Sequence, residues 1–138
     1  MAVIRDNMPA FQLFQRTKVD DALGMLRQHG DSAWVLAGGL DTWDWLKDRV
    51  KRPSVVVDLG SIEELREIRS SDSGLEIGAM ATLSDIAGHE AVRGQDGLPA
   101  DSAGIVASPQ IRNQGTPGGN VSQGTRRGHY RELGLIDI

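Results

Sequence analysis

This chain of 138 residues contains no cysteine, no excess of positive charge and no long apolar run. Without cysteine the chain has no thiol nucleophile and no thiolate ligands for an iron–sulfur cluster, so any such cluster must lie on a partner. Positive charge is not in excess, because the net charge is −4, which gives a nucleic-acid partner no electrostatic support. No apolar run approaches membrane-spanning length, and residues 1–10 lack the hydrophobic core of a signal peptide. We therefore expect no membrane span and a cytoplasmic location.

Two glycine turns are the features of the sequence that most suggest a function. The first, Ala37-Gly38-Gly39, follows the apolar segment 33–36, typical of a buried strand, and precedes a predicted short helix over residues 42–50. A strand, a glycine turn and a helix start together form an anion site, because backbone N–H groups and the helix dipole point at the same place. The second turn, Thr116-Pro117-Gly118-Gly119-Asn120, predicts a nest of N–H groups around another part of the same ligand.

The two turns together are more specific than either alone, because a single Gly-Gly pair is most often only a tight loop. A large ligand such as a dinucleotide needs phosphate contacts and ring contacts at separate places. Neither turn matches the Gly-x-Gly-x-x-Gly fingerprint or the P-loop, so a dinucleotide site here is predicted to be of another kind.

The first sixty residues predict a small parallel α/β lobe. Strands are expected at residues 11–14, 33–36 and 54–59, the last fully buried because it is rich in β-branched residues. A helix capped by Thr17 is expected between the first two strands, and the helix over 42–50 between the last two. Alternating strands and helices favour a parallel sheet.

A second lobe is predicted from residue 61 onward. One helical turn is expected at residues 61–65, followed by a hairpin of strands at 66–70 and 75–80. Thr82 is expected to cap a helix that runs to about Arg93, and residues 99–107 are expected to be helical.

Three stretches of the sequence form a set of ordered motifs: residues 35–41 (VLAGGLD), 75–83 (LEIGAMATL) and 107–120 (ASPQIRNQGTPGGN), of which the third is the most specific. In their order and spacing they resemble the FAD-binding medium subunit of molybdenum hydroxylases, a family that includes xanthine dehydrogenase and carbon monoxide dehydrogenase. The resemblance covers nearly the whole chain up to about Gln123. It implies an α+β, two-lobed FAD-binding domain of the PCMH type, C-terminally shortened. Its small parallel α/β lobe spans residues 1–60, and its mixed or antiparallel lobe spans 61–138, incomplete at the C-terminus.

The resemblance also implies which residues hold FAD. The pyrophosphate is expected around the first turn, at Leu36, Ala37, Gly38, Gly39, Leu40, Asp41 and Thr42. The other side of the cofactor is expected near Thr116, Gly118, Gly119 and Asn120, with Thr82 and Val106 as additional candidates. No catalytic residue is expected in this chain, and no metal site either, because its histidines lack metal-ligand spacing.

Two residues depart from the family pattern. Leu40 stands where many relatives carry a polar residue, which removes a side-chain hydrogen bond to phosphate but leaves the backbone contacts. Pro117 replaces an aliphatic residue, so it must lie where no N–H donor is needed. Among the aromatic residues, Trp34, Trp43 and Trp45 are candidates to stack on the flavin, but core packing and subunit contact are the favoured interpretation.

The function implied by the resemblance is that of an oxidoreductase subunit. Substrate is expected to be oxidised at the molybdenum cofactor of a large partner subunit. Electrons are expected to pass from 2Fe-2S clusters on a small partner subunit through FAD on this chain to an acceptor. The alternative is a shortened, non-redox relative that acts as an assembly or structural subunit. A free-standing nucleotide-binding domain is a weaker third possibility, because no adenine or ribose signature is visible.

Overall fold

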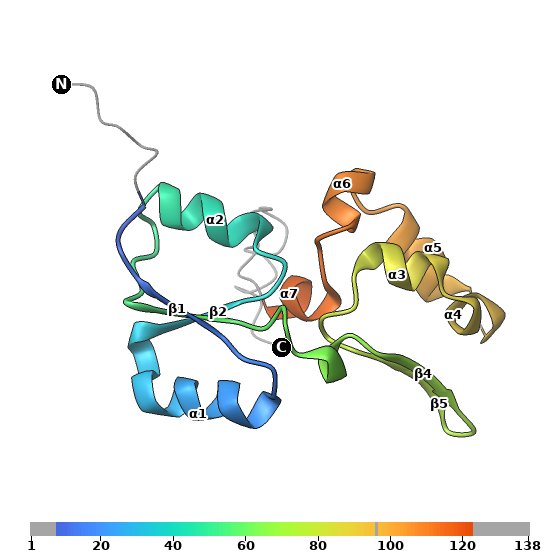
Figure 1. Ribbon diagram of the computed structural model, residues 1–138. Coiled ribbons are helices and arrows are strands. Elements are labelled where there is room, and N and C mark those ends of the chain that lie inside the picture. Colours follow the sequence, from blue (N-terminus) through green and yellow to red (C-terminus); the bar gives the residue numbers. More distant parts are fainter. Residues whose placement is uncertain (1–7, 96, 123–138) are drawn as a thin grey trace, which may run out of the picture.

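A three-stranded parallel sheet forms the centre of the first lobe (Figure 1). The computed structural model describes residues 8–95 and 97–122. The strands are β1 (Gln12–Gln15), β2 (Ala33–Leu36) and β3 (Val55–Asp58), in the spatial order β1-β3-β2. Val56 of β3 is opposite Leu13 on one side and Trp34 on the other, so β3 is the central strand. The predicted parallel α/β lobe is confirmed.

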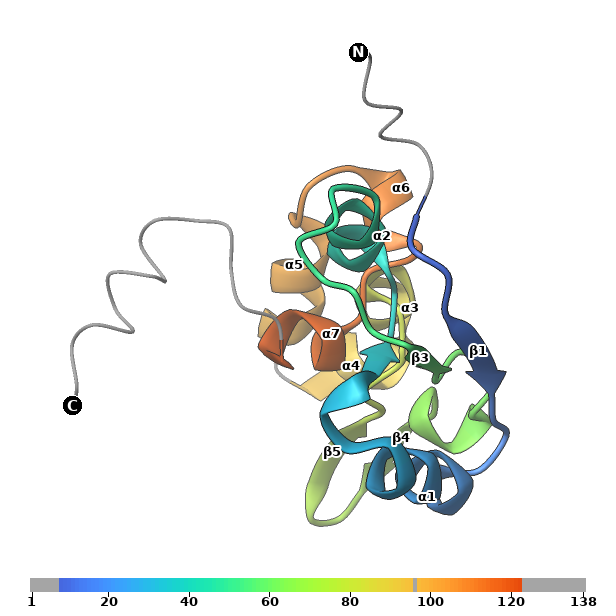
Figure 2. The same ribbon diagram turned by 90° about the vertical axis from the view of Figure 1, so that its left-hand side faces the viewer.

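One helix covers each face of this sheet. α1 (Val19–His29) connects β1 to β2, and α2 (Leu40–Lys47) connects β2 back to β3. The two crossovers run in opposite directions across the sheet, and since each is right-handed they fall on opposite faces. Figures 1 and 2 show α1 below the strands and α2 above them.

The central strand carries the core of this lobe. Val55 and Val57 pack with Ala22 of α1 and with Ile62, whereas Val56 points to the opposite face because successive side chains of a strand alternate. The strand predicted over residues 54–59 is confirmed with shorter bounds, and its burial is confirmed for the three valines only. The predicted burial of the strand at 33–36 is wrong in part: β2 is an edge strand, and its Val35 is 41% exposed.

Both helices of this lobe start at a different residue from the one predicted. α1 begins after Lys18, and Thr17 does not cap it; the N–H of Val19 donates instead to Glu64 Oε1, 3.1 Å away. α2 begins two residues earlier than predicted because Gly39, with φ +82°, serves as its N-cap. It also ends earlier, since Arg49 has a φ of +57°, which stops a right-handed helix.

The second lobe packs helices against an antiparallel hairpin, as the sequence predicts. A 3-10 turn (Glu63–Leu65) precedes the hairpin of β4 (Ile68–Ser71) and β5 (Gly74–Ile77). The helices that follow are α3 (Leu83–Gly88), α4 (Glu90–Gln95), α5 (Leu98–Gly104), α6 (Pro109–Arg112) and α7 (Pro117–Ser122).

This lobe has a core of its own, formed where α3, α4 and α5 meet. Its buried members include Leu83, Ile86, Val92 and Ala103, and Ile77 of the hairpin packs against them. The single helix predicted from Thr82 to about Arg93 is wrong, because His89 is extended (ψ 126°) and separates α3 from α4. None of the helices in the described parts of the chain is both long and apolar enough to cross a membrane.

Candidate functional site

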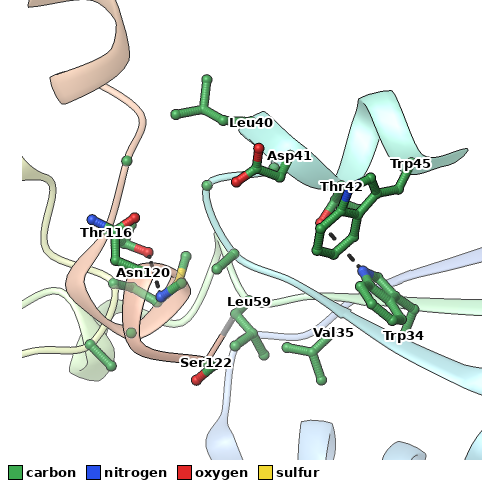
Figure 3. A pocket seen from close by; sticks show the side chains of 18 of the residues that line it. Trp34, Val35, Leu40, Asp41, Thr42, Trp45, Leu59, Thr116, Asn120 and Ser122 are labelled. Atoms are coloured by element: carbon green, nitrogen blue, oxygen red, sulfur yellow. Dashed lines mark hydrogen bonds between the residues drawn. The ribbon is translucent and has the colours of Figure 1, made fainter. Parts of the chain in front are cut away.

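A cavity of about 550 Å³ opens at the carboxyl ends of β2 and β3, where the first lobe faces α7 (Figure 3). Residues 37–42, which follow β2, and Leu59, which follows β3, line one side of it. In open parallel sheets this edge is the usual place for a ligand, because loops and helix starts converge there.

At the first glycine turn, α2 begins without a capping side chain. Gly39 has a φ of +82°, which glycine adopts readily, and a Cβ there would lie 2.7 Å from Trp43 Nε1. As N-cap of α2 it has no side chain to accept a hydrogen bond from the first turn. The N–H groups of that turn must therefore find other partners, which together with the helix dipole favours an anionic ligand.

Gly38 serves protein packing. A Cβ at this position would overlap the backbone carbonyl of Gln114, and Gln114 Nε2 donates a hydrogen bond of 2.6 Å to the Gly38 carbonyl. The close approach that the missing side chain allows is thus to the loop before α7, and it joins the two lobes beside the cavity.

The second glycine turn is the start of a helix, and the predicted nest is wrong. Pro117 is the first residue of α7, a position where its missing N–H has no cost. Gly118 and Gly119 have no positive φ. A Cβ on Gly118 would lie 2.7 Å from the carbonyl oxygen of Ala79, and the Gly118 N–H donates to that oxygen at 2.9 Å. Thr116 is buried, and its Oγ1 accepts from the Gly119 N–H at 3.2 Å.

The structure brings most of the predicted site residues to this one cavity, although they come from segments more than seventy residues apart. Those that line it are Ala37, Gly38, Gly39, Leu40, Asp41, Thr42, Thr116, Gly118, Gly119 and Asn120.

Three predicted residues lie elsewhere. Leu36 is buried within β2. Thr82 caps α3 in a capping box with Asp85. Val106 lines a second, largely apolar cavity of about 600 Å³ beside α3 and α5.

The cavity also has an apolar wall, only part of which the sequence suggests. Trp34, Val35, Trp45, Leu59 and Met80 line it. The sequence names the two tryptophans as candidates to stack on the flavin, with core packing and subunit contact as the favoured interpretation. Leu59 and Met80 had none, because their place depends on where strand ends and loops meet in the folded chain.

The polar side chains that line the site are few. Among the described residues of the lining, Asp41 is the single carboxylate, and the other polar side chains are Thr42, Thr116, Asn120 and Ser122. Within residues 8–95 and 97–122, no three histidine or acidic side chains come together as metal ligands would. An uncapped helix start on one side and an apolar wall on the other fit a ligand with an anionic centre and flat rings.

Comparisons with known proteins agree in sequence and in structure. The family model for the FAD binding domain in molybdopterin dehydrogenase matches residues 9–133. The nicotinate dehydrogenase FAD-subunit of Eubacterium barkeri is 37% identical over 116 residues, which cover 83% of this chain and 39% of that protein. The carbon monoxide dehydrogenase medium chain of Hydrogenophaga pseudoflava is 36% identical over 116 residues, 84% of this chain and 40% of that protein.

The solved structures show the same fold. Carbon monoxide dehydrogenase from Hydrogenophaga pseudoflava matches with a TM-score of 0.80 and 36% identity, over 83% of this chain and 40% of the other. Quinoline 2-oxidoreductase from Pseudomonas putida 86 matches with a TM-score of 0.77 and 30% identity, over 82% of this chain and 39% of the other. The chain thus spans about two fifths of the length of these relatives.

Proposed function

Since this chain belongs to the family of FAD binding domains in molybdopterin dehydrogenases, we propose that its cavity holds FAD and that it is the flavoprotein subunit of a molybdenum-dependent hydroxylase or dehydrogenase. The observation that carries the proposal is the meeting of residues 37–42 with Thr116, Gly119 and Asn120 around one cavity. Both lobes, residues 1–60 and 61–138, belong to the FAD-binding domain in this proposal.

The residues present fit such a cofactor. The diphosphate lies at residues 37–42, where α2 begins without a capping side chain. Thr116 and Asn120 face it from the other lobe (Figure 3). The apolar wall around Trp34 and Leu59 accepts flat ring surface.

The chain's part in the reaction is to bind and orient the cofactor. When bound, FAD supplies the redox chemistry, taking up electrons that come from iron–sulfur centres and releasing them to an acceptor. The sequence has no cysteine to hold such centres. In this proposal the 2Fe-2S clusters belong to a small partner subunit and the molybdenum cofactor to a large one, as the family resemblance implies. The cytoplasmic location also stays a prediction. The alternative of a non-redox assembly subunit finds no support among the relatives, which are named as subunits of dehydrogenases.

The direct test is the visible absorption spectrum of the chain purified under mild conditions, followed by chromatography of the released cofactor. We expect bound FAD, or its uptake when free FAD is added. A chain that neither contains nor takes up FAD contradicts the proposal.

A matched pair of variants tests where the diphosphate lies. Leu40 lines the cavity in the first turn of α2 and is 38% exposed. Leu40→Glu places a carboxylate beside the diphosphate, and we expect affinity for FAD to fall roughly tenfold, which corresponds to about 1.4 kcal/mol of repulsion. Leu40→Gln has the same size without the charge and is the control. Equal affinities of the two variants place the diphosphate elsewhere.

A further inference from the structure

We propose that Trp34 and Trp45 form a ring-binding wall, against which a heteroaromatic ring of the bound dinucleotide stacks. The inference rests on the proposed function, because it concerns the same cavity, and it assigns a role to two residues outside both glycine turns. Trp34 comes from the edge strand β2 and Trp45 from α2, and both line the cavity (Figure 3).

The two indoles form a corner. Their ring centroids are 5.9 Å apart and their planes are inclined by 78°. A flat ring that stacks on one indole meets the other at its edge, and these are the two arrangements that aromatic quadrupoles favour.

The corner is held in place before any ligand binds. Trp34 Nε1 donates to Thr42 Oγ1 at 3.3 Å, and Lys51 Nζ lies 5.4 Å from the centre of the Trp34 ring. A ring that is already oriented loses little side-chain entropy when a ligand stacks on it, so more of the contact energy appears as affinity.

The two side chains pack against each other between β2 and α2, and the part of each that stays exposed lines the cavity. Trp34 and Trp45 are only half-buried, whereas the fully buried side chains on the sheet and α2 are Val56, Val57 and Leu46. Trp43, on the same helix, does not line the cavity and has its Nε1 against Gly39. It is therefore the matched control for a tryptophan of α2 outside the wall.

Adenine and isoalloxazine are both flat heteroaromatic rings, and either one satisfies the geometry. ADP carries the first ring and FMN the second, so the two compounds separate the sources. When an aromatic side chain that stacks on a base is truncated, affinity is expected to fall roughly 10- to 100-fold.

The test is calorimetric titration of the FAD-free chain with FAD, ADP and FMN. We expect Trp34→Leu and Trp45→Leu each to weaken FAD binding at least tenfold, and to weaken binding of one of ADP or FMN far more than the other. Trp34→Phe and Trp45→Phe keep a ring and are expected to retain most of the affinity. Trp43→Leu is expected to bind FAD as the parent does. Thermal unfolding of each variant shows whether it is folded.

Four results overturn the inference. If the Leu variants at 34 and 45 bind FAD as the parent does, the ring lies elsewhere and the proposed function stands. If the Phe variants lose as much affinity as the Leu variants, or if Trp43→Leu loses as much as they do, stacking is not the cause. A parent chain that binds no FAD overturns the proposed function and this inference with it. Should Trp34→Leu fail to fold, Trp45→Leu and the Phe variants decide.

Discussion

Gly38 is a point of close contact between the two lobes, because it lies against the backbone carbonyl of Gln114. The sequence suggested that its missing side chain makes room for a ligand, but the space is taken by the Gln114 carbonyl. Gly119 is different: a Cβ there would lie 3.0 Å from Thr116 Oγ1 and 3.5 Å from the Ala37 Cβ, a tight but less severe contact. A bulky substitution at Gly38 therefore tests the packing of the lobes before it tests cofactor binding.

Gly38→Ala is expected to lower the free energy of unfolding by about 2 kcal/mol even without FAD, in the range that overpacking costs. The control is Gly24→Ala, in the middle of α1, where a Cβ would meet nothing within 4 Å. That change is expected to raise the free energy of unfolding by about 0.5–1 kcal/mol, because alanine favours a helix over glycine. Urea denaturation of the FAD-free chains measures both, and a Gly38→Ala variant as stable as the parent refutes the packing role.

At the scale of the element, α3 shows how a side chain named by a sequence pattern can have a structural role. Thr82 Oγ1 accepts from the Asp85 N–H at 3.0 Å, and Asp85 Oδ2 accepts from the Thr82 N–H at 3.1 Å. These two hydrogen bonds form a capping box at the N-terminus of α3, which is only six residues long. The helix in turn holds Leu83 and Ile86 in the core of the second lobe.

Thr82→Ala is expected to lower the free energy of unfolding by about 1 kcal/mol, the usual cost of losing an N-cap. Affinity for FAD is expected to stay unchanged, because Thr82 does not line the cavity. Thr82→Ser keeps the hydroxyl and is the control. Denaturation and FAD titration measure the two effects separately, and a loss of affinity without a loss of stability supports the cofactor contact that the family resemblance implied.

At the scale of the whole molecule, the hydrogen bond from Gln114 Nε2 to the Gly38 carbonyl links segments 76 positions apart. It joins the loop before α7 to the turn that begins α2. The shape of the cavity depends on these two segments keeping their relative position.

Gln114→Ala is expected to cost at most about 1 kcal/mol of stability, because the bond is exposed. Amide hydrogen exchange in residues 38–42 is expected to become faster, since the turn loses its link to the other lobe. Gln110→Ala, an exposed glutamine of α6, is the control. If both variants exchange like the parent, the link does not hold the turn.

FAD is expected to stabilise both lobes together, because its cavity is built from both. At a free concentration 100 times its dissociation constant, it should add about 2.7 kcal/mol to the free energy of unfolding. Thermal unfolding monitored by circular dichroism at increasing FAD concentrations measures this shift. Leu40→Glu is expected to need more FAD for the same shift, and two separate transitions with only one of them sensitive to FAD would contradict the shared site.

Features that depend on neighbours along the chain can be predicted from local sequence preferences. The valine run of β3, the hairpin of β4 and β5, the Thr82 cap and the strand, glycine turn and helix around Gly39 all follow from local preferences. The family motifs also named most residues of the cavity.

Features that depend on residues far apart in the chain become visible only in the folded protein. Glu64 is 45 positions from Val19 in the sequence, but folding brings its carboxylate within hydrogen-bond distance of the Val19 N–H. It therefore takes the place that the sequence assigned to Thr17 at the start of α1. The edge position of β2 leaves Trp34 to line the cavity beside Trp45 instead of joining the core. Periodicity and propensity record how a residue prefers its immediate neighbours, and they carry no information about which distant backbone or side chain will pack against it.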